Sequence, residues 1–154
     1  MNNQLPIFED LLNRSFTSLS RLEETHLKQS LHQELTVNDF HIIQSIGLYT
    51  ERTMSELAKI LAITPGALTP AVDRLVKKGF IARNHNDQDR RVILIKLTTR
   101  GEAAFREHAR FHAQITQKLV EDLTLEEGMA LLKALEKLAD SVTSQATESG
   151  TPSV

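Results

Sequence analysis

The first part of the chain carries apolar side chains at helical spacing. Between residues 5 and 34 they recur every three to five positions, and glycine and proline are absent from residue 7 to residue 46. This spacing predicts a long amphipathic helix. Several of its apolar residues need a partner to bury them. The stripe consists of Leu5, Phe8, Leu12, Phe16, Leu19, Leu22, Leu27 and Leu31.

Capping motifs divide the middle of the chain into short helices. Residues 36–39 and 53–56 both begin with threonine and end with an acidic residue, which predicts two helix starts. Thr64 followed by Pro65 predicts a third helix, since proline suits the first helical position. That helix should end at Gly79, because glycine is the preferred residue just past a helix.

The hydrophobic period changes from helical spacing to alternation after this point. Residues 80–83 and 91–97 predict two strands, and the polar residues between them predict the turn of a hairpin with a charged tip. Capping boxes at 99–102 and 124–127 then predict two final helices. From residue 143 the sequence becomes rich in Ser, Thr, Gly and Pro, which favours a disordered tail.

This order of elements is that of a winged helix-turn-helix, in a mostly α fold with a two-stranded β-wing. Both terminal segments are amphipathic and acidic, which favours dimerisation helices. We expect an N-terminal dimerisation helix in 1–35, a DNA-binding domain in 36–101, C-terminal dimerisation helices in 102–143 and the tail in 144–154.

Charge is distributed unevenly along the chain. The formal net charge is −2, yet residues 41–101 carry +5 between acidic flanks of −3 and −4. A basic middle segment is typical of a surface that faces an anion such as DNA. A winged helix that binds only proteins would instead have a neutral or acidic wing. That alternative interaction module stays open, but the charge argues against it.

Other classes of protein lack support in the sequence. The chain has no cysteine, which excludes disulfides, thiol nucleophiles and cysteine metal sites. It also lacks a Gly-rich phosphate loop and a nucleophile elbow, so we expect no enzyme activity. No apolar run reaches the length of a membrane helix, and the start does not resemble a signal peptide, which predicts a cytoplasmic protein without a membrane partner.

The helix that begins at Pro65 has the chemistry of a recognition helix. Its first turn is small and polar, so the backbone can approach DNA, and its amino end favours phosphate. At the hairpin tip, Arg90 suits a narrow minor groove, and we expect Arg91 to pair with Asp73 and fix the wing against the helix. The predicted DNA-binding residues are Ser55, Thr64, Pro65, Gly66, Ala67, Thr69, Pro70, Arg74, Lys77, Asp89, Arg90 and Arg91.

Three segments of the sequence resemble the MarR family of bacterial transcription regulators. They are residues 54–58, residues 72–81 and, most specifically, the wing and its exit at residues 87–101. The resemblance implies a homodimer with intertwined terminal helices. It further implies repression at a pseudo-palindromic double-stranded DNA operator, controlled by a small effector bound between the dimerisation and DNA-binding regions.

Two effectors are compatible with the sequence, and no cofactor is required. Residues 106–112, 40–43 and 87–91 are similar to repressors of fatty-acid synthesis genes in Gram-positive bacteria, which implies an effector of long acyl chains on acyl carrier protein. An acyl chain needs an apolar tunnel. The candidate lining residues are Phe16, Leu19, Phe40, Ile43, Phe111 and Ile115.

The alternative effector is zinc. His108 and His112 are four residues apart, so both imidazoles lie on one helical face and can reach one ion. His41 and either Glu23 or Glu24 could complete a tetrahedral site. Zinc-sensing members of the family look similar in these places, although a thiolate ligand is impossible here. Alternatively, all these residues simply form the dimer core, with the histidines hydrogen-bonded inside it.

Overall fold

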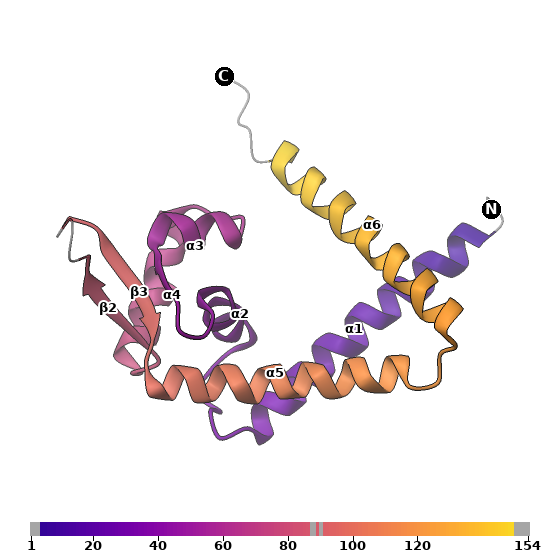
Figure 1. The fold of residues 1–154 in the computed structure, drawn as a ribbon, viewed down its shortest axis with the longest axis horizontal. Coiled ribbons are helices and arrows are strands. Elements are labelled where there is room, and N and C mark those ends of the chain that lie inside the picture. Colours follow the sequence, from indigo (N-terminus) through magenta and orange to yellow (C-terminus); the bar gives the residue numbers. More distant parts are fainter. Residues whose placement is uncertain (1–3, 87–88, 90, 150–154) are drawn as a thin grey trace.

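The computed structural model describes residues 4–86, 89 and 91–149, with side chains up to residue 142. The described part is mainly helical, and Figure 1 shows how its elements are arranged. In chain order they are α1 (Leu5–Gln29), α2 (Val37–Ile46), β1 (Glu51–Thr53), α3 (Met54–Ile60), α4 (Pro65–Lys77), β2 (Ile81–His85), β3 (Ile93–Leu97), α5 (Thr99–Val120) and α6 (Leu125–Ser149).

The predicted helix caps are formed in the structure with one exception. Thr36 and Thr53 make complete capping boxes at α2 and α3, and the Thr64 hydroxyl accepts from the Ala67 N–H at 3.2 Å. Helix α5 is capped by Thr98 rather than by Thr99, because the Thr98 hydroxyl accepts the Gly101 N–H. Because Thr98 and Thr99 are adjacent and either can cap a helix, the sequence alone did not show which of them begins α5.

The wing belongs to a three-stranded antiparallel sheet with the order β1-β3-β2. The expected hairpin of β2 and β3 is present, with Arg83 opposite Ile95. The two-stranded prediction missed β1, which places Arg52 opposite Ile95 on the other side of β3. Strand β1 has only three residues and runs directly into the cap of α3, so it shows no alternation of its own.

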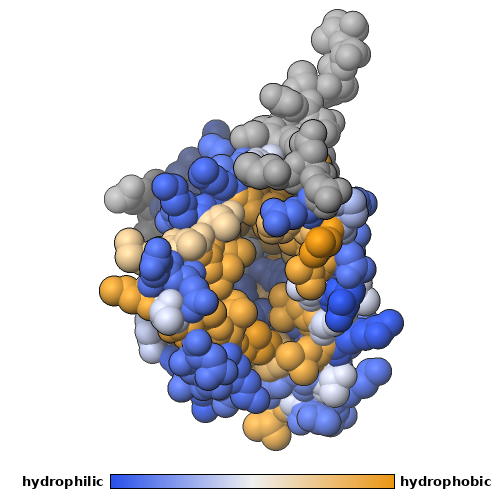
Figure 2. Space-filling view, turned by 90° about the vertical axis from the view of Figure 1, so that its right-hand side faces the viewer, coloured by the Kyte–Doolittle hydropathy of each residue, from blue (hydrophilic) through white to orange (hydrophobic). Residues whose placement is uncertain are grey.

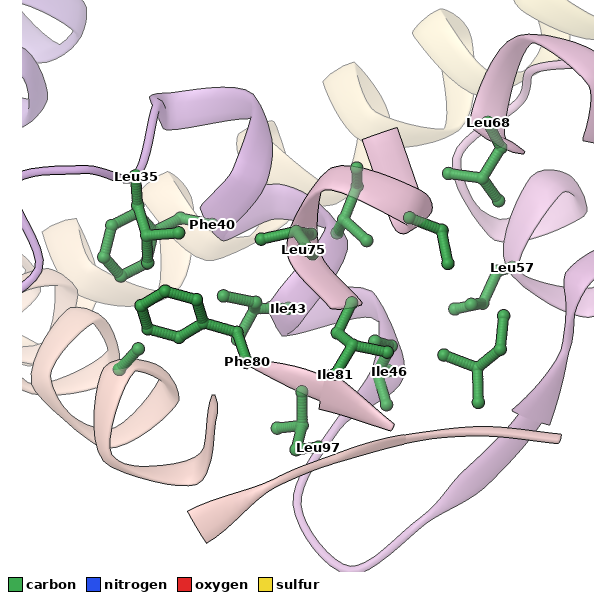
Figure 3. Close-up of a cluster of buried hydrophobic side chains, with 14 of the residues drawn as sticks. Leu35, Phe40, Ile43, Ile46, Leu57, Leu68, Leu75, Phe80, Ile81 and Leu97 are labelled. Carbon is green, nitrogen blue, oxygen red and sulfur yellow. The ribbon is translucent and has the colours of Figure 1, made fainter. Parts of the chain in front are cut away.

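The hydrophobic core lies where α2, α3 and α4 pack against the sheet and the start of α5. Figure 3 shows side chains from all these elements converging. Phe40, Ile43, Leu75 and Phe80 are completely buried. Burial of side chains of this size stabilises the fold by about 1.5–3 kcal/mol each. The core therefore holds α4 rigidly against α2, α3 and the sheet.

Helices α1, α5 and α6 extend away from this core (Figure 1). Helix α6 continues to Ser149, so the tail predicted from residue 144 is helical as far as that residue. Proline and glycine do not occur in α6 after Gly128, and the polar residues from 143 onward tolerate helical backbone next to an established helix. Residues 150–154 lie outside the described part. No helix of the described residues is long and apolar enough to cross a membrane.

Candidate DNA-binding surface

A tight turn joins α3 to α4, the helix that the sequence predicts to be the recognition helix. Ala62 adopts a positive φ of 53°, and the Ile63 N–H donates to the Ala58 carbonyl at 3.0 Å. Leu57 of α3 and Leu68 of α4 are completely buried on the inner side of this turn. These contacts fix the direction in which α4 leaves the turn, with its capped amino end at the surface.

The outer face of α4 carries most of the predicted DNA contacts. Leu68, Val72 and Leu75 point into the core, whereas the predicted contact residues of the described chain are all exposed. The Thr69 hydroxyl donates to the Pro65 carbonyl at 2.8 Å. The exposed set comprises Ser55, Thr64, Pro65, Gly66, Ala67, Thr69, Pro70, Arg74, Lys77, Asp89 and Arg91.

Arg74 has a structural partner that sequence reasoning missed. Its guanidinium donates to the Oδ1 atom of Asp39 at 2.6 Å, and Lys78 Nζ lies 3.4 Å from Oδ2 of the same carboxylate. The Asp39 side chain has no solvent exposure. Arg74 therefore ties α4 to α2, and its assignment as a DNA contact stays a prediction. The only feature of the sequence that pointed to Asp39 was its place at the N3 position of the capping box that begins at Thr36.

The pKa of Asp39 is lowered by these partners. Burial by itself raises the pKa, but the hydrogen bonds from Arg74 and the Thr36 N–H and the charges of Arg74 and Lys78 bring it below its ordinary value of 3.8. A carboxyl group whose folded-state pKa is depressed stabilises the fold above its unfolded pKa. That contribution is lost as the pH falls through the folded-state value.

We expect replacement of Asp39 by alanine to lower the free energy of unfolding by about 1–2 kcal/mol, because the Thr36 N–H loses its capping acceptor and two partly exposed cations lose their partner. Chemical denaturation at pH 7 measures the loss. Asp39→Asn keeps an acceptor for the cap but removes the charge, so the fall in stability below about pH 4 should shrink. An acid-stability profile identical to that of the natural chain would contradict this role.

The ion pair between wing and recognition helix exists with a different arginine. Asp73 accepts from Arg83 of β2 at 2.6 Å, so the predicted pair of Asp73 with Arg91 is wrong. Arg83 is closer to α4 in sequence and lies on the strand that contacts it. Asp89 organises the tip, since its carboxylate accepts the Arg91 N–H at 2.9 Å. Arg90 lies outside the described residues.

The segment that leaves the wing, residues 98–100, makes contacts that the sequence did not predict. The Thr98 N–H donates to the Phe80 carbonyl at 3.0 Å, and its hydroxyl donates to the Gly79 carbonyl at 2.6 Å. Arg100 lies 4.3 Å above the Phe80 ring and pairs with Glu34. These contacts join the end of α4, the linker before α2 and the start of α5.

The histidines of α5 gather with one carboxylate of α1. Nε2 of His112 lies 3.0 Å from Nε2 of His108 and 3.2 Å from Oε1 of Glu23. Glu23, His108 and His112 thus place three ligand-type atoms within 4.8 Å of one another. Glu24 and His41 do not join them. Glu24 lines a separate pocket with Leu27, and His41 is exposed beside another pocket with Ile42.

His108 is suited chemically to bind a metal. Burial lowers its pKa to about 4, assisted by the neighbouring His112, His41 and His26. Its ring packs against Phe40 with 4.7 Å between ring centroids. At neutral pH the imidazole is neutral, which is the protonation state that coordinates metal ions.

The predicted acyl tunnel is divided in the structure. Phe40 and Ile43 are completely buried in the core and line none of the described pockets. Phe16 and Leu19 are exposed on α1 instead. Phe111 and Ile115 remain beside a pocket of about 550 Å³, together with Leu22, Gln114, Gln117, Lys118 and Glu121. The six residues therefore do not form one tunnel within a single copy of the chain.

Comparison with known proteins identifies the family. The MarR family profile matches residues 35–93, which span α2 to the start of β3. The multiple antibiotic resistance protein MarR of Escherichia coli is 37% identical over 106 residues, which cover 68% of this chain and 74% of that protein. The chain belongs to the MarR family. The repressor MdtR of Bacillus subtilis is 31% identical over 119 residues, or 77% of each chain.

Solved structures of MarR-family proteins have the same architecture. The structure of Streptococcus pneumoniae FabT in complex with DNA superposes with a TM-score of 0.87, at 29% identity, covering 92% of this chain and 99% of that one. A mutant E. coli MarR complexed with operator DNA gives a TM-score of 0.66 at 32% identity, covering 88% and 96%. The chain is thus a winged-helix, DNA-binding transcriptional regulator, and DNA is its partner. As the sequence predicted, it is not an enzyme.

Proposed function

We propose that the protein is a homodimeric repressor that binds a pseudo-palindromic operator. The observation that carries this proposal is the apolar surface left uncovered on α1, α5 and α6. Large apolar side chains there are between about one third and four fifths exposed, which is unusual for a protein that acts as a monomer. They are Leu5, Ile7, Phe8, Leu11, Leu12, Phe16, Leu19 and Leu22 of α1, Leu119 and Val120 of α5, and Leu125, Met129, Leu132, Leu135 and Val142 of α6.

Figure 2 views this end of the molecule, where apolar residues surround a hollow with a polar rim. The helices of a second copy fit this surface, because the exposed apolar faces of the two copies would bury each other. Twofold symmetry then places two copies of α4 on the same side of the dimer. Each α4 reads one half-site, and the half-sites lie about one helical turn of DNA apart.

Salt dependence of DNA binding tests this function against a protein-interaction role. A duplex selected from a random library is titrated by fluorescence anisotropy. If six or more phosphates are contacted, affinity should fall about a thousandfold or more between 50 and 200 mM salt. Arg90→Ala should weaken binding with the dimer intact. If no duplex is selected, or if salt has no effect, DNA repression is excluded as the function.

Two effectors remain candidates. For an acyl chain, the candidate binding site is now the single pocket that Phe111 and Ile115 line. The pocket between α1 and α5 is lined by Leu22, Phe111 and Ile115, and also by Lys118, which offers a cation for a polar head group. In a dimer, the exposed α1 residues Phe16 and Leu19 would extend the apolar lining. An acyl chain, free or delivered by acyl carrier protein, suits this combination of apolar side chains and a cation.

Zinc is the second candidate, and the grouping of Glu23, His108 and His112 favours it. Two neutral imidazoles and one carboxylate provide three protein ligands, and a fourth position would be left for water or another group. His112 and Glu23 already lie within hydrogen-bond distance, so little rearrangement is needed. Binding there would tie α1 to α5 and change how the dimer holds its two recognition helices.

Isothermal titration with zinc and with a long-chain fatty acid separates the two effectors. If zinc is the effector, His112→Gln should weaken zinc binding at least about tenfold. His41→Gln is the matched control and should leave it unchanged, because His41 lies outside the group. Heat from the fatty acid alone, with zinc inert, would favour the acyl effector. Equal loss in both histidine variants would contradict the proposed ligand set.

A further inference from the structure

The guanidinium of Arg100 bridges two segments from distant parts of the chain. Its Nη1 atom donates to the Lys78 carbonyl at 2.7 Å, and its Nη2 atom pairs with the Glu34 carboxylate. Lys78 is the C-cap of α4, and carbonyls at the end of a helix lack donors within it. A cation there also suits the helix dipole. Arg100, near the start of α5, thus holds both the end of α4 and the linker before α2.

Two further contacts complete this junction. Lys78 Nζ donates to the Glu34 carbonyl, so the main chain and the side chain of Glu34 are both bonded. The guanidinium of Arg100 lies 4.3 Å above the ring of Phe80, which is completely buried and attracts a cation over its face. Glu34, Lys78, Phe80 and Arg100 together form the α4–α5 joint.

The α4–α5 joint lies at the opposite end of α4 from the residues that we expect to contact bases. Helix α4 has 13 residues, so it is about 20 Å long, and Thr64 and Thr69 lie at its amino end. A tilt of about 10° at the joint would move that end by about 3.4 Å, which is one base-pair step along DNA. Small changes at the joint therefore matter at the scale of a half-site.

Helix α5 connects the α4–α5 joint to the proposed dimer interface. It runs from the base of the wing to the loop before α6 (Figure 1), and it ends at the exposed apolar residues Leu119 and Val120. In a dimer, each α5 would be the rod that links the interface to one α4. The angle at the joint would then set the distance between the amino ends of the two α4 helices.

We propose that Arg100 is a positioning residue that sets the spacing of half-sites which the dimer accepts. The inference rests on the proposed function, because it needs two copies of α4 on one operator. Arg100 acts through the Lys78 carbonyl and Glu34, not through DNA. Its loss leaves the base contacts of each α4 in place but loosens the angle at which the dimer presents them.

Affinity for operators of different spacing tests this role. The selected duplex is compared with duplexes that have one base pair inserted or removed between the half-sites. Arg100→Ala should reduce the preference for the selected spacing about fivefold, the value of roughly one hydrogen bond, whereas base preferences within each half-site stay unchanged. Arg110→Ala is the matched control and should keep the spacing preference. It removes the same charge from α5, and Arg110 donates to the Arg106 carbonyl one turn earlier.

Variants of Glu34 show whether the effect passes through the α4–α5 joint. Glu34→Ala removes the carboxylate but keeps the carbonyl that Lys78 bonds, so it should also weaken the spacing preference. It carries the test by itself if Arg100→Ala does not fold. The double variant should lose little more than Arg100→Ala alone, because both changes break one contact.

Three results have distinct meanings. An unchanged spacing preference in Arg100→Ala and Glu34→Ala would overturn the proposal. So would a salt slope that falls by about 0.9 for each arginine removed, because that fall would mark Arg100 as a direct phosphate contact. If the natural chain selects no paired half-sites, the proposed function itself fails.

Discussion

Replacing Gly101 with alanine is expected to destabilise the protein by about 3 kcal/mol. A Cβ atom at this position would lie 2.1 Å from the Phe80 carbonyl oxygen and 3.3 Å from Cβ of Leu97. The first neighbour is backbone, and it also accepts the Thr98 N–H that starts α5. Relief of the clash must therefore move the end of α4 or the start of α5.

Thermal and chemical denaturation measure this loss, which corresponds to a fall in melting temperature of about 10 °C for a chain of this size. Gly128→Ala is the matched control. Gly128 lies inside α6, and an added Cβ would meet nothing within 4 Å. That change should be neutral or stabilising by about 0.5–1 kcal/mol. Equal stability of the Gly101 and Gly128 variants would show that the close approach to Phe80 is not a constraint.

The second large effect concerns the apolar face of α1. The double variant with Phe8→Glu and Phe16→Glu should be monomeric at micromolar concentration, because each glutamate would place an unpaired charge inside the proposed interface. Both phenylalanines are more than half exposed in a single chain, so their replacement removes little from its own core. Operator affinity should fall at least about a hundredfold, since the two half-sites lose their connection.

Sedimentation velocity and anisotropy with the selected duplex measure the two consequences together. Thr17→Glu serves as the control, because Thr17 lies on the opposite face of α1 and is exposed. It should remain dimeric and bind DNA normally. A phenylalanine double variant that remains dimeric would rule out this face as the interface.

Local sequence signals predicted the architecture because each capping motif depends only on neighbouring residues. Thr36, Thr53 and Thr64 cap their helices as expected, and Gly79 ends α4 with a positive φ of 77°. The change from helical to alternating period likewise located the hairpin. These features need no knowledge of distant parts of the chain.

Long-range pairs were the features that sequence reasoning could not assign. Asp39 meets Arg74 from 35 positions away, and nothing near either residue predicts their contact. The partner of Asp73 depends on the position of β2 relative to α4, so Arg91 was chosen where Arg83 is correct. Strand β1 was missed because its three residues are defined by pairing with β3.

The group of Glu23, His108 and His112 was predictable from the sequence only in part. The pair of His108 and His112 follows from helical spacing alone, whereas the choice between Glu23 and Glu24 depends on how α1 is rotated against α5. The structure places Glu23 in the group and Glu24 on another side of the helix. Likewise, Phe40 and Ile43 are apolar enough to line a tunnel, but in the structure they are part of the hydrophobic core.

Native mass spectrometry of the protein mixed with its selected operator duplex reports on dimerisation and DNA binding in one experiment. We expect one dominant complex that contains two chains and one duplex, with free protein at the mass of a dimer. The complex should disappear in the phenylalanine double variant and persist in Thr17→Glu. A complex of one chain with one duplex, or free protein at the mass of a monomer, would contradict a dimeric repressor.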